Sequence, residues 1–280
     1  AYRAEIESVA RWDRDTPIYR TLQGPTRHST INKVVSFGSR VLAVSNETSV
    51  FQWNVEDSSF LRHRGHSGPI CAISFMNGPQ SGCNTLISSS PSHRFVTGSF
   101  DGTARLWSTD ASLSCAVFQH EDWVREVAGF NNSVAAVCRD GFLSVWDIQA
   151  GTRTVHTRAH DSTATCMAVW GAGSGDSAAA GGSDGLIISG GADGALRMWD
   201  SRPSTVQYTT QFLTPNTVDC VHCVVRHDNV LCAGLSNGDV RVWDIRNSQT
   251  PLFEINGHGY RCGAIQCDSG TLACAFEDGS

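Results

Sequence analysis

The sequence predicts an all-β protein built from a repeated unit of four strands. Two observations carry this prediction: short apolar strands repeatedly end in a tryptophan, and a turn residue of acidic or amide type stands six positions before each of these tryptophans. Composition agrees, because 27 glycines against 8 prolines in 280 residues suit many short strands joined by tight turns. The 40% hydrophobic and 17% charged content is typical of a folded protein.

The third strand of the unit is the clearest element. In four of the five copies the residues one and three positions before the tryptophan are apolar and the residue between them is polar, which is the alternation of a half-buried strand. The copies are Ser49–Trp53, Ala104–Trp107, Leu143–Asp147, Leu196–Asp200 and Val240–Asp244.

A tight turn and a second strand precede each third strand. The turn residues are Glu47, Asp101, Asp140, Asp193 and Asn237, and glycine follows all of them except Glu47. Asp-Gly or Asn-Gly between two apolar runs favours a hairpin, because such a turn needs positive φ. The second strands are expected at Val41–Val44, Phe95–Gly98, Val134–Val137, Leu186–Gly190 and Val230–Gly234. A further copy begins at Leu272.

A histidine opens most copies. His120 precedes Asp140 by 20 residues, and His28 precedes Glu47 by 19. Two copies are longer, and their extra residues, at Met76–His93 and Gly171–Asp184, are interpreted as inserted surface loops. With its Gly-His and Trp-Asp marks, the unit resembles the WD-repeat family, in which each repeat is one four-stranded blade of a β-propeller.

In that family the turn acid bonds a histidine, a Ser or Thr and the indole of the tryptophan. The resemblance therefore implies such a buried, hydrogen-bonded set of four side chains in a blade, which we call a structural pin. The second and fourth copies keep all four residue types: His66, Thr97, Asp101 and Trp107, and His160, Ser189, Asp193 and Trp199. The other copies lack one or more members, for example the hydroxyl that Ala136 replaces, and we expect those blades to be less rigid. Since the His–Asp–Ser/Thr sets recur once per blade, they are interpreted as pins and not as hydrolase triads.

The two ends of the chain are expected to share the last blade. Ser8–Asp13 matches a third strand and Pro17–Leu22 a fourth strand, whereas the residues from His258 to Asp278 supply only the first two. Joined, they complete one blade and close a ring without free sheet edges. The prediction is one domain over residues 1–280 with six blades; seven, the commoner number in the family, is the alternative.

The resemblance also indicates where partners would bind. Partner residues in the family lie near the start of the first strand of each unit, which is the innermost strand of the blade, and just before the turn acid. Carried over position by position, this predicts a partner-binding surface of Phe100, Trp123, Arg125 and Arg139, extended by Arg261 and Lys33. Trp and Arg are enriched in binding hot spots. A cationic, aromatic rim favours acidic or phosphorylated peptides.

A second motif gives an alternative function. Trp-Asp-x-Arg occurs twice in tandem and ends at Arg202 and Arg246. Such repeats resemble those of substrate receptors that dock on the adaptor of cullin-type ubiquitin ligases. The tetrapeptide is short, however, and many WD-repeat proteins carry it without that role.

Charge and cysteine content restrict the remaining classes. The net charge of −6 and the lack of a Lys/Arg run argue against direct nucleic-acid contact, although a ribonucleoprotein component stays open as an alternative. No apolar run is long enough to span a membrane. Eleven scattered cysteines favour a reducing intracellular compartment, cytoplasm or nucleus. The sequence predicts a non-enzymatic scaffold for other proteins, with no cofactor and no metal; Cys220–Cys223 has metal-like spacing but lacks a second ligand pair.

Overall fold

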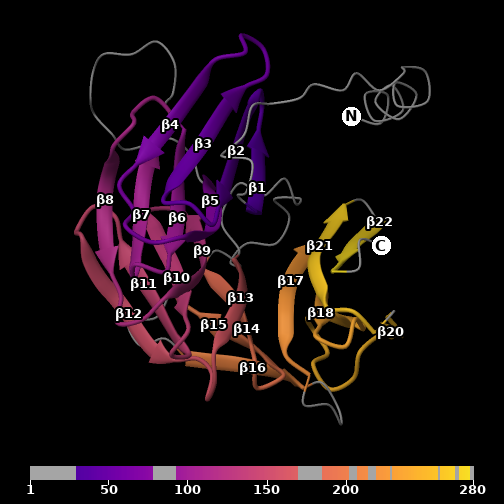
Figure 1. The fold of residues 1–280 in the computed structure, drawn as a ribbon. Coiled ribbons are helices and arrows are strands. Elements are labelled where there is room, and N and C mark those ends of the chain that lie inside the picture. The colour runs from indigo at the N-terminus through magenta and orange to yellow at the C-terminus, as the bar shows by residue number, and fades with distance from the viewer. Residues whose placement is uncertain are drawn as a thin grey trace, which may run out of the picture.

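The computed structural model describes residues 30–77, 93–169, 185–201, 207–213, 219–227, 229–257, 259–268 and 271–277. These residues form 22 β-strands and contain no helix, so none of them belongs to a helix that could cross a membrane. Figure 1 shows the sheets following one another around an arc, from β1 in indigo to β22 in yellow, with β1 and β22 on the same side of the molecule.

The first three blades contain twelve strands. The first blade has β1 (Ile31–Phe37), β2 (Arg40–Ser45), β3 (Ser49–Asn54) and β4 (Phe60–Arg64). The second has β5 (Ile70–Asn77), β6 (Arg94–Ser99), β7 (Thr103–Ser108) and β8 (Ser114–Gln119). The third has β9 (Val124–Phe130), β10 (Ser133–Cys138), β11 (Phe142–Asp147) and β12 (Thr152–Arg158).

Two further blades and a hairpin complete the described chain. The fourth blade has β13 (Ala164–Val169), β14 (Leu186–Gly191), β15 (Ala195–Asp200) and β16 (Gln207–Leu213). The fifth has β17 (Val221–His227), β18 (Val230–Leu235), β19 (Val240–Asp244) and β20 (Phe253–Ile255). The last hairpin pairs β21 (Cys262–Asp268) with β22 (Thr271–Phe276).

The antiparallel order within each blade follows from the tight turns. In the second blade Gly98 pairs with Ala104 across the turn, and Gly102 has a φ of 75°, a conformation that favours glycine. Gly194 does the same in the fourth blade with a φ of 74°. The predicted second and third strands are therefore present in all five blades.

The core lies between successive blades. Residues of each outermost strand pack on the tryptophan of the next blade: the ring centroids of Phe118 and Trp146 are 5.5 Å apart, and those of Phe212 and Trp243 are 6.2 Å apart. Trp107, Trp243 and Phe212 are fully buried. Burial of these rings supplies much of the apolar stabilisation that joins the blades.

The second and third blades are also joined by their backbones. Inner strands β5 and β9 pair in parallel, Met76 with Gly129 and Asn77 with Phe130, so that the two blades form one eight-stranded sheet.

The predicted closure of the ring lies outside the described residues, because Ser8–Asp13 and Pro17–Leu22 both precede residue 30. The number of blades and the single domain therefore stay predictions, as do the two inserted loops, of which residues 78–92 and 170–184 are not described. Ile255 bears on the closure. It pairs with Val240 at the register position that Phe118 and Phe212 hold in their blades, yet it is 44% exposed.

Trp12 is the tryptophan of Ser8–Asp13, the predicted third strand of the last blade. We expect Ile255 to pack on Trp12 if the N-terminal strands complete that blade. Replacing Ile255 by Ser would then remove a buried aliphatic side chain and lower the free energy of unfolding by about 2 kcal/mol, measured by urea titration. Val117 on outer strand β8 is a matched control, because it is 43% exposed, and Val117→Ser should change stability by less than about 0.5 kcal/mol. Equal stability of the two variants would contradict closure through Trp12.

Candidate functional site

In the second blade, four predicted pin residues form one hydrogen-bonded chain. The Trp107 indole N–H donates to Thr97 Oγ1 over 2.8 Å, and Thr97 Oγ1 lies 2.7 Å from His66 Nε2. His66 Nδ1 lies 2.8 Å from Asp101 Oδ2. A neutral imidazole that carries its proton on Nδ1 satisfies every member, because each group then donates to the next.

The Asp101 carboxylate ends this chain. Burial raises its pKa, but hydrogen bonds from His66, from Thr103 and from the Ser67 backbone amide outweigh burial and hold the pKa well below its usual range. The carboxylate is therefore charged and held in place by donors from both sides of the turn.

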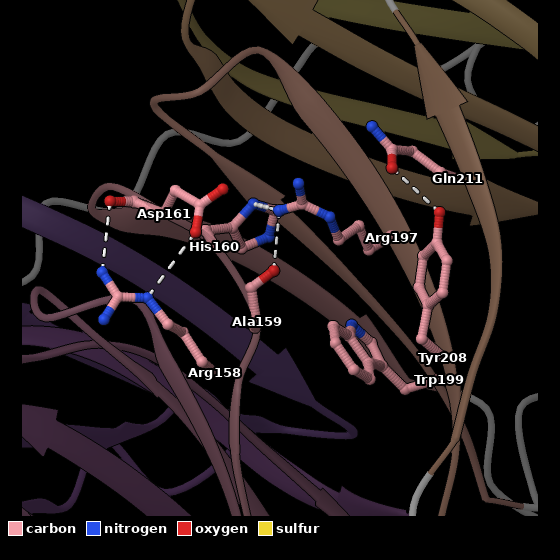
Figure 2. Close-up of a pocket in the computed structure, with 8 residues that line it drawn as sticks. All are labelled: Arg158, Ala159, His160, Asp161, Arg197, Trp199, Tyr208 and Gln211. Carbon is pink, nitrogen blue, oxygen red and sulfur yellow. Dashed lines mark hydrogen bonds and ion pairs between the residues drawn. The ribbon is translucent and has the colours of Figure 1, made fainter.

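The fourth blade repeats the arrangement beside a pocket of about 370 Å³, drawn in Figure 2. Ser189 Oγ accepts from the Trp199 indole over 2.9 Å and lies 2.8 Å from His160 Nε2, while His160 Nδ1 lies 2.9 Å from Asp193. Ser189 is fully buried, so its hydroxyl cannot meet a substrate. The set has the partners of a structural pin and lacks the accessible nucleophile of a hydrolase.

The cations that line this pocket are already neutralised. Arg197 Nη1 donates to Asp193 Oδ2 over 2.7 Å and to the Ala159 carbonyl oxygen over 2.7 Å, and Arg158 Nε lies 3.7 Å from Asp161 Oδ1. Figure 2 shows Arg197 beside His160 and Arg158 beside Asp161. The pocket therefore offers no unpaired arginine to a ligand.

In the third blade, the missing hydroxyl leaves buried polar groups without hydrogen-bond partners. Ala136 stands where Thr97 and Ser189 stand, and the Trp146 indole N–H and His120 Nε2 are both buried without a hydrogen-bond partner. Burial lowers the pKa of His120 to about 4, against a smaller opposing effect of the Glu121 charge. In the fifth blade Ala233 takes this place, and the Trp243 indole N–H is likewise unpaired.

The structure brings four of the predicted partner residues together in one stack, which we call the Arg–aromatic stack: Phe100, Trp123, Arg125 and Arg139. The rings of Phe100 and Trp123 lie parallel, with centroids 4.5 Å apart and an interplanar angle of 10°. The Arg139 guanidinium lies 4.5 Å from the Trp123 centroid, and the Arg125 guanidinium lies 5.9 Å from the Phe100 centroid. Trp123 is 40% exposed.

The backbone fixes the stack across two blades. The Phe100 amide donates to the Pro69 carbonyl oxygen over 3.0 Å, and the Arg139 amide donates to the Trp123 carbonyl oxygen over 2.9 Å. Each bond ties the residue before a turn acid to the residue before an innermost strand of the same blade. The aromatic rings of Phe100 and Trp123 then meet between the second blade and the third.

Most of the described arginines are paired with a carboxylate, but Arg125 and Arg139 are not, and neither are Arg64, Arg94 and Arg105. Among the described residues, neither Arg125 nor Arg139 has a carboxylate within ion-pair distance. Eight other arginines do: Arg40, Arg62, Arg153, Arg158, Arg197, Arg241, Arg246 and Arg261. The stack therefore presents two unneutralised cations on a chain of net charge −6.

Arg125 also lacks an interblade contact that three of the other five described bulge residues make. Each innermost strand starts with a β-bulge, at Asn32, Cys71, Arg125, Thr165, His222 and Gly263. Asn32 donates to the Ile70 carbonyl oxygen, Cys71 to that of Val124 and Thr165 to that of Val221, which in each case lies just before the next bulge. No such bond is made by Arg125, whose buried Nε has no hydrogen-bond partner in the structure. Its guanidinium lies over Phe100 instead.

Lys33 does not occupy the position that counting from His28 predicts. The bulge of the first blade is at Asn32, because this copy is one residue shorter between its histidine and its turn acid. Counting back from Glu47 would have found Asn32. Lys33 binds both carboxylate oxygens of Glu126, over 2.8 and 2.9 Å, and Glu126 was not foreseen as its partner.

The remaining predicted residues are spread over other parts of the chain. Arg261 lies just before β21 and pairs with Glu277. Arg246 is 71% exposed and donates from Nε to Asp244 Oδ1 over 2.9 Å, and these hydrogen bonds lower the pKa of Asp244 to about 2. Arg202 lies outside the described residues.

The Cys220–Cys223 segment does not gather ligands around one point. Cys220 donates to the Ala192 carbonyl oxygen, whereas Cys223 Sγ lies 3.8 Å from Cys262 Sγ. Within the described ranges no three His, Cys, Asp or Glu side chains are grouped so that they could hold a metal ion.

Comparison with known proteins identifies the repeat. The family model "WD domain, G-beta repeat" matches residues 58–108, which include the blade that keeps the complete His66–Thr97–Asp101–Trp107 pin. In overall fold the chain is similar to the crystal structure of the computationally designed Ika8 protein, with a TM-score of 0.69 and 20% identity over 89% of this chain and 69% of that one.

Natural relatives are similar at low identity. Autophagy-related protein 16 of Arabidopsis thaliana is 22% identical over 85% of this chain and 43% of its own length. The ribosome biogenesis protein WDR12 homolog of Drosophila mojavensis is 26% identical over 75% and 50%, respectively. The U5 small nuclear ribonucleoprotein 40 kDa protein of Dictyostelium discoideum is 23% identical over 81% and 46%. The chain thus spans about half the length of these curated relatives.

Restoring the missing hydroxyl should stabilise the third blade. In an Ala136→Ser variant the new Oγ can accept from the Trp146 indole and donate to His120 Nε2, as Ser189 does in the fourth blade. We expect the free energy of unfolding to rise by about 1 kcal/mol, measured by urea titration. The reverse change, Thr97→Ala, should lower it by about 2 kcal/mol because it leaves two buried groups unpaired. An unchanged or lower stability of Ala136→Ser would contradict the pin model.

Stability should also fall in mildly acidic solution because of His120. Its folded-state pKa of about 4 lies below the unfolded value of about 6.5. As the pH falls from 6.5 towards 4, the unfolded chain binds a proton that folded His120 does not, so the folded state loses stability. Urea titrations across this range should show the decline, and it should be smaller in a His120→Asn variant. An imidazole of His120 that titrates near pH 6.5 by NMR in the folded chain would overturn this.

Proposed function

Because this chain belongs to the WD-repeat family of β-propeller proteins, we propose that it is a non-enzymatic scaffold that holds other proteins within a complex, and that the Arg–aromatic stack is a partner-binding surface. Members of a repeat family differ in function mainly through the side chains that a common frame presents.

One observation carries the assignment of the stack. At the bulge position where Asn32, Cys71 and Thr165 join neighbouring blades, Arg125 makes no interblade bond and keeps its guanidinium beside an aromatic ring. An arginine with a buried, unpaired Nε does not stabilise the fold through that atom. Binding a partner gives such a side chain a role that packing alone does not.

The chemistry of the stack favours an acidic or phosphorylated segment. Phe100 covers one face of Trp123 and Arg139 lies against Trp123 as well, so the rings support the guanidinium groups more than they offer open faces for stacking. Guanidinium groups bind carboxylate and phosphate in a bidentate geometry. Because neighbouring rings restrict both arginines, less side-chain entropy is lost on binding.

The names of the relatives support an assembly role. One is a ribosome biogenesis protein and another a U5 small nuclear ribonucleoprotein component, so a component of a ribonucleoprotein assembly is the alternative that they favour. The ten described cysteines are all free. A reducing compartment, cytoplasm or nucleus, is proposed on that basis together with these relatives.

A ubiquitin-ligase substrate receptor is a further alternative, supported by the exposed Arg246 of the second Trp-Asp-x-Arg motif. Co-purification of the ligase adaptor, lost when Arg202 and Arg246 are both replaced by Ala, would favour it over the scaffold proposal.

Removing the stack should abolish partner capture without unfolding the chain. We expect Trp123→Ala and Arg125→Ala each to weaken binding of a captured partner at least tenfold, measured by titration of the purified pair, with the melting midpoint nearly unchanged. The affinity should fall as salt rises, because cations carry the contact.

Arg62→Ala is the matched control. Arg62 also lies over a ring, 5.3 Å from the centroid of Phe51, but it is paired with Glu47. Its replacement should leave partner affinity unchanged. Equal binding by the wild type and the two stack variants would refute the proposal.

A further inference from the structure

Two cysteines meet at the junction between the fifth blade and the last hairpin. Cys223 belongs to β17 and Cys262 to β21, neighbouring innermost strands that Figure 1 shows side by side. The Cys223 thiol donates a hydrogen bond to Cys262 Sγ, with the sulfur atoms 3.8 Å apart, and Cys223 Sγ also lies 3.4 Å from the Cys262 carbonyl oxygen. They stand 39 residues apart in the sequence.

The neighbouring strand leaves room for both sulfurs. Gly234 of β18 pairs with Cys223, and a Cβ added there would lie 2.6 Å from Cys262 Sγ and 2.7 Å from Cys223 Sγ. Any other residue would therefore push the two sulfur atoms. The contact between the two sulfurs therefore depends on Gly234 as well. Gly234 does not have a positive φ, so the backbone does not require glycine there, and what matters is that glycine has no side chain.

The two thiols differ in chemistry. The hydrogen bond from the Cys223 thiol, and after it burial, raises the pKa of Cys223; the same hydrogen bond lowers the pKa of Cys262 despite burial. The pair can thus release one proton more easily than an isolated buried thiol would. Cys223 is partly exposed whereas Cys262 is fully buried, so a small oxidant reaches the pair from the Cys223 side.

We propose that Cys223 and Cys262 are a site of reversible oxidation, at which a hydroperoxide converts the two thiols into a disulfide that ties β17 to β21. The proposal is independent of the partner surface. One thiolate of the pair attacks a peroxide oxygen, the O–O bond breaks, and the sulfur becomes a sulfenic acid while the first water leaves. The second thiol attacks that sulfur, the S–S bond forms, and the sulfenic hydroxyl leaves as a second water. Two thiols lose two electrons and two protons, and hydrogen peroxide becomes two waters.

The location gives the bond a mechanical consequence. The last hairpin has only two strands, and in the described chain β21 lies against β17 and β18 of the fifth blade. A covalent link between residues far apart in sequence restricts the unfolded chain and so favours the folded state. Oxidation would therefore fasten the hairpin to the fifth blade.

Mass spectrometry of the whole purified chain tests the proposal. The reduced protein is treated with hydrogen peroxide, quenched, unfolded in iodoacetamide and digested. We expect a peptide pair joined through Cys223 and Cys262, reversed by dithiothreitol, and a melting midpoint several degrees above that of the reduced protein.

Variants identify the sulfurs. The cross-link should persist in Cys267→Ser and Cys274→Ser, whose cysteines share the tryptic peptide of Cys262, and disappear in Cys223→Ala and Cys262→Ala. Gly234→Ala should slow it at least tenfold by separating the sulfurs. Cys115 is exposed and serves as the internal control for oxidation. If Cys115 is consumed while Cys223 and Cys262 stay fully alkylatable, or if Cys223 links to another cysteine, the proposal is wrong.

Discussion

A chain of buried hydrogen bonds from an indole through a hydroxyl and an imidazole to a carboxylate is the interaction on which each complete blade depends. In the second blade it joins Trp107 of the third strand, Thr97 of the second, His66 before the first and Asp101 of the turn. Four segments that are separate in sequence are thereby fixed by three contacts. Burying polar groups is favourable only when all are paired, which makes the chain cooperative. Where Ala136 interrupts it, the neighbouring donor and imidazole nitrogen stay unpaired.

The repeated frame also makes it possible to recognise side chains that depart from the contacts of their counterparts. Every described blade presents a bulge residue at an equivalent place, and in three of them, at Asn32, Cys71 and Thr165, its side chain bonds a neighbouring blade. Arg125 makes no such bond, and among the described residues Arg125 and Arg139 contact rings and no carboxylate. In a repeat protein, a side chain that abandons the contact made by its counterparts is therefore a better indicator of a binding surface than its residue type alone.

Local chemistry made much of this fold predictable from the sequence. Asp-Gly turns and alternating strands located the second and third strands of all five blades, because these signals act over a few residues. The pins of the second and fourth blades were implied by the resemblance to the WD-repeat family, because both blades keep all four residue types that the family's pin requires. Lys33 was misplaced because positions were counted forward from His28, and the first copy is one residue shorter between this histidine and Glu47. Its ion pair with Glu126 joins strands of two different blades, and no local pattern encodes such a contact.

The same limit applies to the stack. The family resemblance placed Phe100, Trp123, Arg125 and Arg139 on neighbouring blades, but the parallel arrangement of the rings depends on side-chain packing in three dimensions. The bulge at the start of each innermost strand was likewise not foreseen, since it arises from strand pairing and carries no composition signal of its own.

The parallel pairing of β5 with β9 links the two blades that carry the stack through their main chains. Phe100 belongs to the second blade and Trp123 to the third, and Met76 and Asn77 are hydrogen-bonded to the third blade within a continuous sheet. Main-chain hydrogen bonds between two blades restrict their relative movement more than side-chain contacts alone would. The backbone therefore restricts the relative position of the Phe100 and Trp123 rings. A partner that binds the proposed surface would meet rings that are already held in place.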